Sequence, residues 1–163
     1  MFNADSVQRL HLSQKYRSGV HWFYWIAGLT LVTSVISLAG GGWRFFLSLG
    51  ITQLVDAIAV ELSASLGNAT KVIAIVLDIF AIAVFAVSGW LASKRHLWAY
   101  VVGMVLFLLD GVVSLVFGDW LGVIVHAIVL VVMFRAFQSG LELAALERAQ
   151  VSQPQETTVT ASV

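Results

Sequence analysis

The sequence predicts an all-α integral membrane protein, a four-transmembrane-helix antiparallel bundle with both termini cytoplasmic. Two observations lead to this fold class. The chain has 163 residues, of which 60% are hydrophobic and 11% charged, with a mean hydropathy of +0.92. A soluble domain averages roughly 45–50% apolar and about 25% charged residues. Four separate segments are also apolar over the length of about 20 residues that a helix needs to cross a bilayer.

The same composition excludes several classes of protein. A soluble globular domain carries more charge than this chain, and a disordered chain has far fewer apolar residues. Nine basic and nine acidic residues leave no net charge to attract a polyanion, so no nucleic-acid partner is expected. The absence of cysteine from the sequence excludes disulfides, thiolate zinc sites and iron–sulfur clusters.

The membrane-spanning segments are predicted to be helices. Inside a bilayer, backbone groups must be hydrogen-bonded within the segment, which favours α-helices over open strands. The links between the last three segments are very short, so these helices must be antiparallel neighbours. The four predicted spans are residues 21–39, 72–92, 97–117 and 120–137.

Residues 45–66 form a fifth apolar stretch with a different pattern. Ser48, Thr52 and Asp56 recur every four residues and share one helix face, with Gln53 beside them. Apolar residues fill the other side. This pattern predicts an amphipathic helix that lies in the outer interface of the membrane, between the first two spans.

The distribution of basic residues tests this topology, because cytoplasmic loops carry an excess of Lys and Arg. With four spans and the N-terminus inside, Arg44 and Lys71 lie outside and the other seven of the nine basic residues lie inside. If residues 45–66 also crossed, four would lie inside and five outside. The count favours four spans with cytoplasmic termini, in a plasma or inner membrane.

Aromatic residues near the span ends are consistent with the same boundaries, because Trp and Tyr concentrate at membrane interfaces. The predicted anchors are Trp22, Trp25, Trp90, Trp98, Tyr16, Tyr24 and Tyr100 at inner ends, and Trp43 and Trp120 at outer ends.

The chain is expected to form one membrane-embedded domain over residues 1–150, followed by a disordered tail over 151–163. Within the domain, Leu141–Ala149 is rich in good helix formers and predicts a separate helix at the inner surface. Gly140 is expected to break this helix from the fourth span.

Three ionisable residues lie inside predicted spans: Asp78, Asp110 and His126. A charged acid at the bilayer centre costs about 2.5–3.5 kcal/mol on insertion scales, so such residues are functional candidates. At 1.5 Å per helical residue, all three lie roughly 9–11 Å below the outer ends of their spans. We expect them to converge on one intramembrane site in the outer half of the bundle.

Carboxylates and an imidazole suit a divalent metal such as zinc, and they suit proton binding or transfer equally well. The interfacial helix would cover the site from outside. The predicted metal ligands are Asp78, Asp110, His126 and Asp56, and the predicted supporting residues are Gln53, Thr33, Ser34 and Ser114.

Two other hypotheses stay open. The same carboxylates and His126 are candidate catalytic residues of an intramembrane metal-assisted hydrolase that acts on a lipid or a membrane peptide. Otherwise the chain is a structural or assembly subunit, in a homo-oligomer or with a partner membrane subunit. In that case Asp110 and His126 form a pair that fixes helix packing, and Asp78 bonds to Thr33 or Ser34.

The metal hypothesis predicts that a divalent cation such as zinc raises the melting temperature of the detergent-solubilised chain. A ligand that binds only the folded state stabilises it by mass action. The measurement is a thermal-unfolding scan across divalent metals, with elemental analysis of the purified chain. If no metal shifts the melting temperature and none is bound, the metal hypothesis is wrong, and the proton and structural hypotheses remain for this site.

Overall fold

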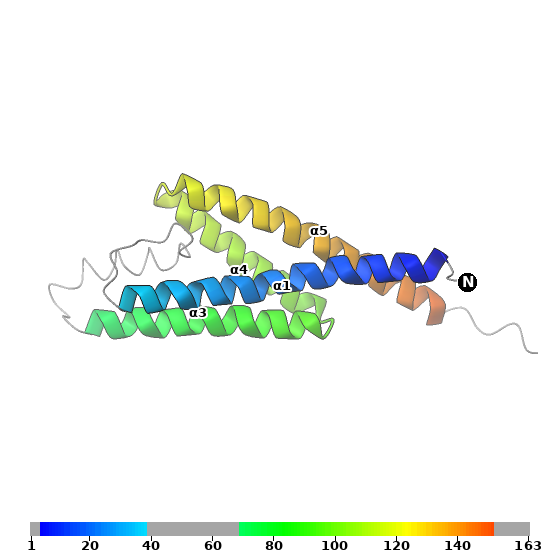
Figure 1. The fold of residues 1–163 in the computed structure, drawn as a ribbon, viewed down its shortest axis with the longest axis horizontal. Coiled ribbons are helices and arrows are strands. Elements are labelled where there is room, and N and C mark those ends of the chain that lie inside the picture. The colour runs from blue at the N-terminus through cyan, green and yellow to red at the C-terminus, as the bar shows by residue number, and fades with distance from the viewer. Residues whose placement is uncertain (1–3, 39–68, 152–163) are drawn as a thin grey trace, which may run out of the picture.

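The computed structural model describes residues 4–38 and 69–151, and both parts are helical, with no strand among them. This confirms the all-α prediction. The amphipathic helix predicted over 45–66, including Gln53 and Asp56, lies outside the described residues. The helices are α1 (Ala4–Leu38), α3 (Ala69–Ser93), α4 (Leu97–Val116) and α5 (Trp120–Val151) (Figure 1).

All four helices are long and apolar enough to cross a membrane. Their outward-facing side chains are largely apolar; Phe80 and Trp98, for example, are 65% and 61% exposed. A soluble helical bundle would carry polar residues on that surface, whereas a lipid-facing surface is apolar. The chain is therefore an integral membrane protein, as predicted.

The helices form a closed ring in which α1 packs against α3 and α5, and α4 packs against the same two helices. Helices α3, α4 and α5 run antiparallel in turn, as the short links between them require, and α1 is antiparallel to α3 (Figure 1). The start of α1 and the end of α5 therefore lie at one end of the bundle, here called the termini end, and the α4–α5 turn lies at the far end (Figure 1). That the termini end is cytoplasmic stays a prediction.

Helices α1 and α5 extend well beyond the predicted first and fourth spans at the termini end. Their extensions pack against each other because each retains an apolar stripe, in which Leu12 and Leu143 are buried. The Arg9 guanidinium donates a hydrogen bond to the Leu146 carbonyl at 3.1 Å. Helices α1 and α5 therefore remain packed against each other outside the predicted membrane spans.

The predicted break at Gly140 is wrong, because α5 is continuous through this residue. Gly140 is buried against the ring of Tyr16, and a Cβ at this position would collide with that ring. The low helix propensity of glycine is outweighed here by the close approach of α1 to α5. Leu141–Ala149 is therefore the last part of α5 and not a separate helix.

Tyr16 and Tyr100 are core residues rather than interfacial anchors. Both are almost completely buried. The Tyr16 hydroxyl donates to the Ala92 carbonyl at 2.8 Å, and the Tyr100 hydroxyl donates to the Met133 carbonyl at 2.9 Å. Each phenol therefore connects two helices with its polar atom satisfied inside the bundle.

A fully buried phenylalanine completes the core of the termini half. The Phe23 ring meets Tyr100 edge-on, with ring centroids 5.1 Å apart. On α4 it lies directly against Gly103, where a Cβ would collide with the Phe23 ring. Glycine at this position lets α1 and α4 approach across the ring of helices.

We expect Gly103→Ala to lower the free energy of unfolding by about 1–3 kcal/mol, because the new methyl group overpacks the Phe23 site. Gly28→Ala is the matched control, since Gly28 lies in a helix with open space where a Cβ would be. It should change stability by about 1 kcal/mol or less, in the stabilising direction. Reversible unfolding in mixed detergent measures both. Equal effects of the two substitutions would contradict this account of the core.

Candidate functional site

The α4–α5 turn determines which residues of the two helices face each other. Gly118 takes a positive φ of 71° in this turn. Asp119 directly precedes α5, and its Oδ1 accepts a hydrogen bond from the Gly122 N–H at 2.9 Å. The tight turn makes α4 and α5 antiparallel neighbours in a fixed register. This register brings Asp110 opposite His126.

Asp110 and His126 form a buried pair, only 6% and 7% exposed. Asp110 Oδ2 lies 2.7 Å from His126 Nε2, and His126 Nδ1 lies 2.7 Å from the Gly122 carbonyl oxygen. Because a carbonyl can only accept, Nδ1 must carry a hydrogen. The contact between Nε2 and Oδ2 then holds one proton, on the imidazole or on the carboxyl group. Either arrangement has no net charge.

The His126 ring is also fixed by its apolar neighbours. It stacks on Phe107 with ring centroids 4.5 Å apart and an interplanar angle of 24°. Gly111 lies beside it, and a Cβ at Gly111 would come within 3.1 Å of the His126 Cβ. The imidazole is therefore held both by its two hydrogen bonds and by close packing.

Two of the predicted supporting residues bond to their own helices. The Ser114 hydroxyl, fully buried, donates to the Asp110 carbonyl at 3.2 Å. The Thr33 hydroxyl donates to the Thr30 carbonyl at 2.8 Å. Helical Ser and Thr commonly bond in this way to the preceding turn. These contacts are with backbone carbonyls, and they do not connect either side chain to the Asp110 carboxyl group or the His126 imidazole.

Asp78 lies at a different helix interface, between α3 and α1. Its Oδ2 is 2.7 Å from Ser34 Oγ, which is also 2.9 Å from the Thr30 carbonyl oxygen. A hydroxyl has one hydrogen to donate. Ser34 Oγ is the donor in both contacts, so this hydrogen is shared between the Asp78 carboxyl group on α3 and the backbone of α1.

The structure thus brings together two of the three predicted site residues. Asp110 and His126 lie at one level and touch, whereas Asp78 pairs with Ser34. Among residues 4–38 and 69–151, no three His, Cys, Asp or Glu side chains are grouped closely enough to hold a metal ion. Asp56, the fourth predicted ligand, is not described. Metal binding at this site therefore stays a prediction.

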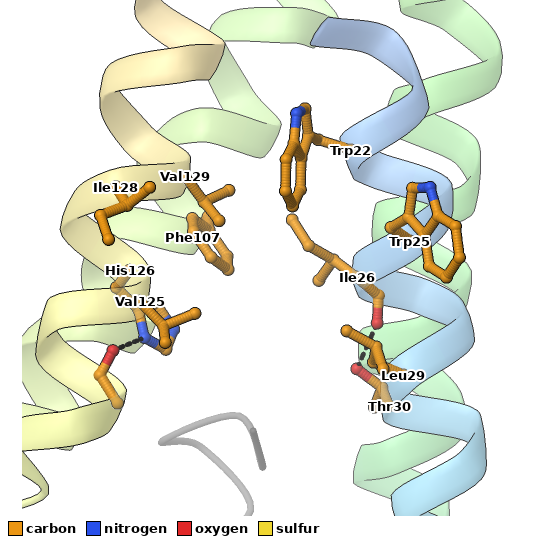
Figure 2. A pocket seen from close by; sticks show the side chains of 11 residues that line it. Trp22, Trp25, Ile26, Leu29, Thr30, Phe107, Val125, His126, Ile128 and Val129 are labelled. Atoms are coloured by element: carbon orange, nitrogen blue, oxygen red, sulfur yellow. Dashed lines mark hydrogen bonds between the residues drawn. The ribbon is translucent and has the colours of Figure 1, made fainter. Parts of the chain in front are cut away.

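A cavity of about 350 Å³ lies beside His126, between α1 and α5 (Figure 2). Its walls are almost entirely apolar. Sequence reasoning did not find this cavity, because a lining at helical spacing looks like an ordinary packed face. The lining includes Trp22, Ile26 and Leu29 of α1, and Val125, His126 and Val129 of α5.

The comparisons with known proteins add no functional information. No protein family, curated protein or solved structure matches this chain. The interpretation of the site therefore depends on its own chemistry.

We expect Asp110→Ala or His126→Ala to destabilise the chain by about 3–5 kcal/mol, because each leaves a buried polar partner unsatisfied. The double variant should lose less than the sum, since neither partner is then left alone. A double-mutant cycle on the free energy of unfolding measures this coupling. The same cycle on Ser34 and Asp78, which are only half-buried, is the control and should give a smaller coupling of about 0.5–1.5 kcal/mol. Additive losses at Asp110 and His126 would contradict the pair.

Proposed function

We propose that this integral membrane protein binds an exchangeable proton at Asp110 and His126, within the membrane. The observation that carries the proposal is the 2.7 Å contact between Asp110 Oδ2 and His126 Nε2, buried between α4 and α5. Aspartate and histidine are side chains whose protonation changes within the physiological range when their surroundings are altered. A buried acid–imidazole pair is a common arrangement for holding and releasing a proton.

The second hydrogen bond of His126 supports this function. The Gly122 carbonyl keeps a hydrogen on Nδ1, so uptake and release are directed to Nε2 and the Asp110 carboxyl group. Gly122 itself is oriented by Asp119, which accepts its N–H at the start of α5. A half-exposed carboxylate thus lies near the pair, toward the far end of the bundle.

A structural role is the second candidate, and a specific observation favours it. Each intramembrane acid pairs with a residue of an adjacent helix: Asp110 with His126 across α4 and α5, and Asp78 with Ser34 across α3 and α1. Such pairs fix helix register in membranes, at about 0.6–2 kcal/mol each. The two roles differ in one respect, because a purely structural pair need not exchange its proton.

We expect the His126 imidazole to exchange its proton across the pH range in which the full chain stays folded, with a midpoint that depends on Asp110. The measurement is nitrogen NMR of ¹⁵N-histidine-labelled protein in detergent across that pH range. In Asp110→Asn the midpoint should move, because a neutral amide replaces the titrating partner.

Asp78→Asn is the matched control. It removes an acid from the same half of the bundle without touching His126, and it should leave the His126 midpoint unchanged. If His126 keeps one protonation state across the whole range, or titrates identically in Asp110→Asn, the pair is structural and the proton-binding function is wrong.

A further inference from the structure

Apart from the two tryptophan indoles, every polar side chain among the described residues that line the cavity beside His126 is already hydrogen-bonded. The Thr30 hydroxyl donates to the Ile26 carbonyl at 2.8 Å, and both His126 nitrogens are engaged by Asp110 and Gly122. The indole nitrogens of the lining tryptophans point away from Thr30 and His126 (Figure 2). Because a buried water needs two to four polar partners, this cavity is unsuited to water. A polar ligand would lose its own hydrogen bonds on entering.

The cavity opens onto the lipid-facing surface of the bundle. Trp25 of α1 and Ile128 of α5 both line it, yet they are 65% and 59% exposed. Both residues lie within predicted spans, so a mouth between these two helices would face the inside of the membrane. A cavity of about 350 Å³ is also large enough for a ligand, since binding sites for small molecules begin at roughly 300 Å³.

We propose that the cavity holds an acyl chain of a bilayer phospholipid, which enters between α1 and α5 and lies against the His126 ring. Three properties favour this occupant: almost entirely apolar walls, Thr30 and His126 side chains that are already hydrogen-bonded within the protein, and an opening within the predicted spans. Phospholipid chains are the solvent at that opening, so even weak affinity fills the site by mass action. This inference does not depend on proton exchange at Asp110 and His126.

The test uses the full chain in detergent micelles, with a phosphatidylcholine that carries a nitroxide label midway along one acyl chain. Electron spin resonance separates labels that the protein immobilises from labels that move freely in the micelle. We expect an immobilised fraction that saturates with added lipid and is displaced by unlabelled phosphatidylcholine.

Two substitutions fill the cavity from opposite walls: Val125→Phe on α5 and Leu29→Phe on α1. Each should weaken lipid binding by about tenfold or more, because a chain can no longer fit without overpacking. The matched controls are Val131→Phe and Leu31→Phe, which place the same ring at exposed positions on the same helices. These controls should bind as the original chain does. Circular dichroism and gel filtration confirm that each variant is folded.

Two results would overturn the proposal. One is the absence of a saturable immobilised fraction in the original chain, which would mean that another copy or another part of this chain closes the cavity. The other is equal binding by the cavity-filling variants and their controls. Asp110→Asn should retain lipid binding, so that failure of the lipid site and failure of proton binding are distinguished.

Discussion

Hydrocarbon offers no hydrogen bonds, and this constraint governs the whole structure. Every polar side chain that enters the membrane must find its partner inside the protein. Among the described residues, every buried side-chain nitrogen and oxygen has such a partner. Tyr16 and Tyr100 use backbone carbonyls of neighbouring helices, and Asp110 uses the imidazole of His126. The same requirement that satisfies these groups therefore also connects the helices.

The two halves of the bundle meet this constraint differently. In the termini half, aromatic rings lie against glycines of facing helices, which gives close packing around Phe23 and Tyr100. Toward the far end the α4–α5 pair diverges from the α1–α3 pair (Figure 1). Each pair there contains one acid–partner contact, and the cavity lies where α1 and α5 separate. The densely packed termini half thus adjoins a more open half, which contains both acid–partner contacts and the cavity.

Much of the fold could be predicted from the sequence, because membrane thickness sets helix length and short links set direction. The second and third spans and the start of the fourth agree with α3, α4 and α5 within a few residues. The continuation of α1 and α5 beyond the spans was missed. Hydropathy identifies segments that are apolar enough to lie in lipid. Leu12 and Leu143 lie outside the predicted spans and are instead buried between α1 and α5. The break predicted at Gly140 was wrong for a similar reason. The helix propensity of glycine contains no information about its contact with the Tyr16 ring on α1.

The candidate site was predicted in part. Counting residues from a tight turn was sufficient to place Asp110 beside His126, because the turn transmits register directly from α4 to α5. The same count could not separate Asp78 from this pair. Depth in the membrane is one coordinate, and the rotation of each helix about its axis is another that the sequence does not specify. For Asp78 the rotation is seen in its contact with Ser34, which joins helices distant in sequence.

The unbroken course of α5 has a mechanical consequence. Its 32 residues form a rod of about 48 Å, with His126 near one end and Glu147 near the other. Glu147 forms a 3.0 Å ion pair with Arg95 in the turn between α3 and α4. A rod without a hinge cannot tilt at one end only. A displacement of the α5 axis at His126 would therefore be transmitted along the helix to Glu147, at the termini end of the bundle.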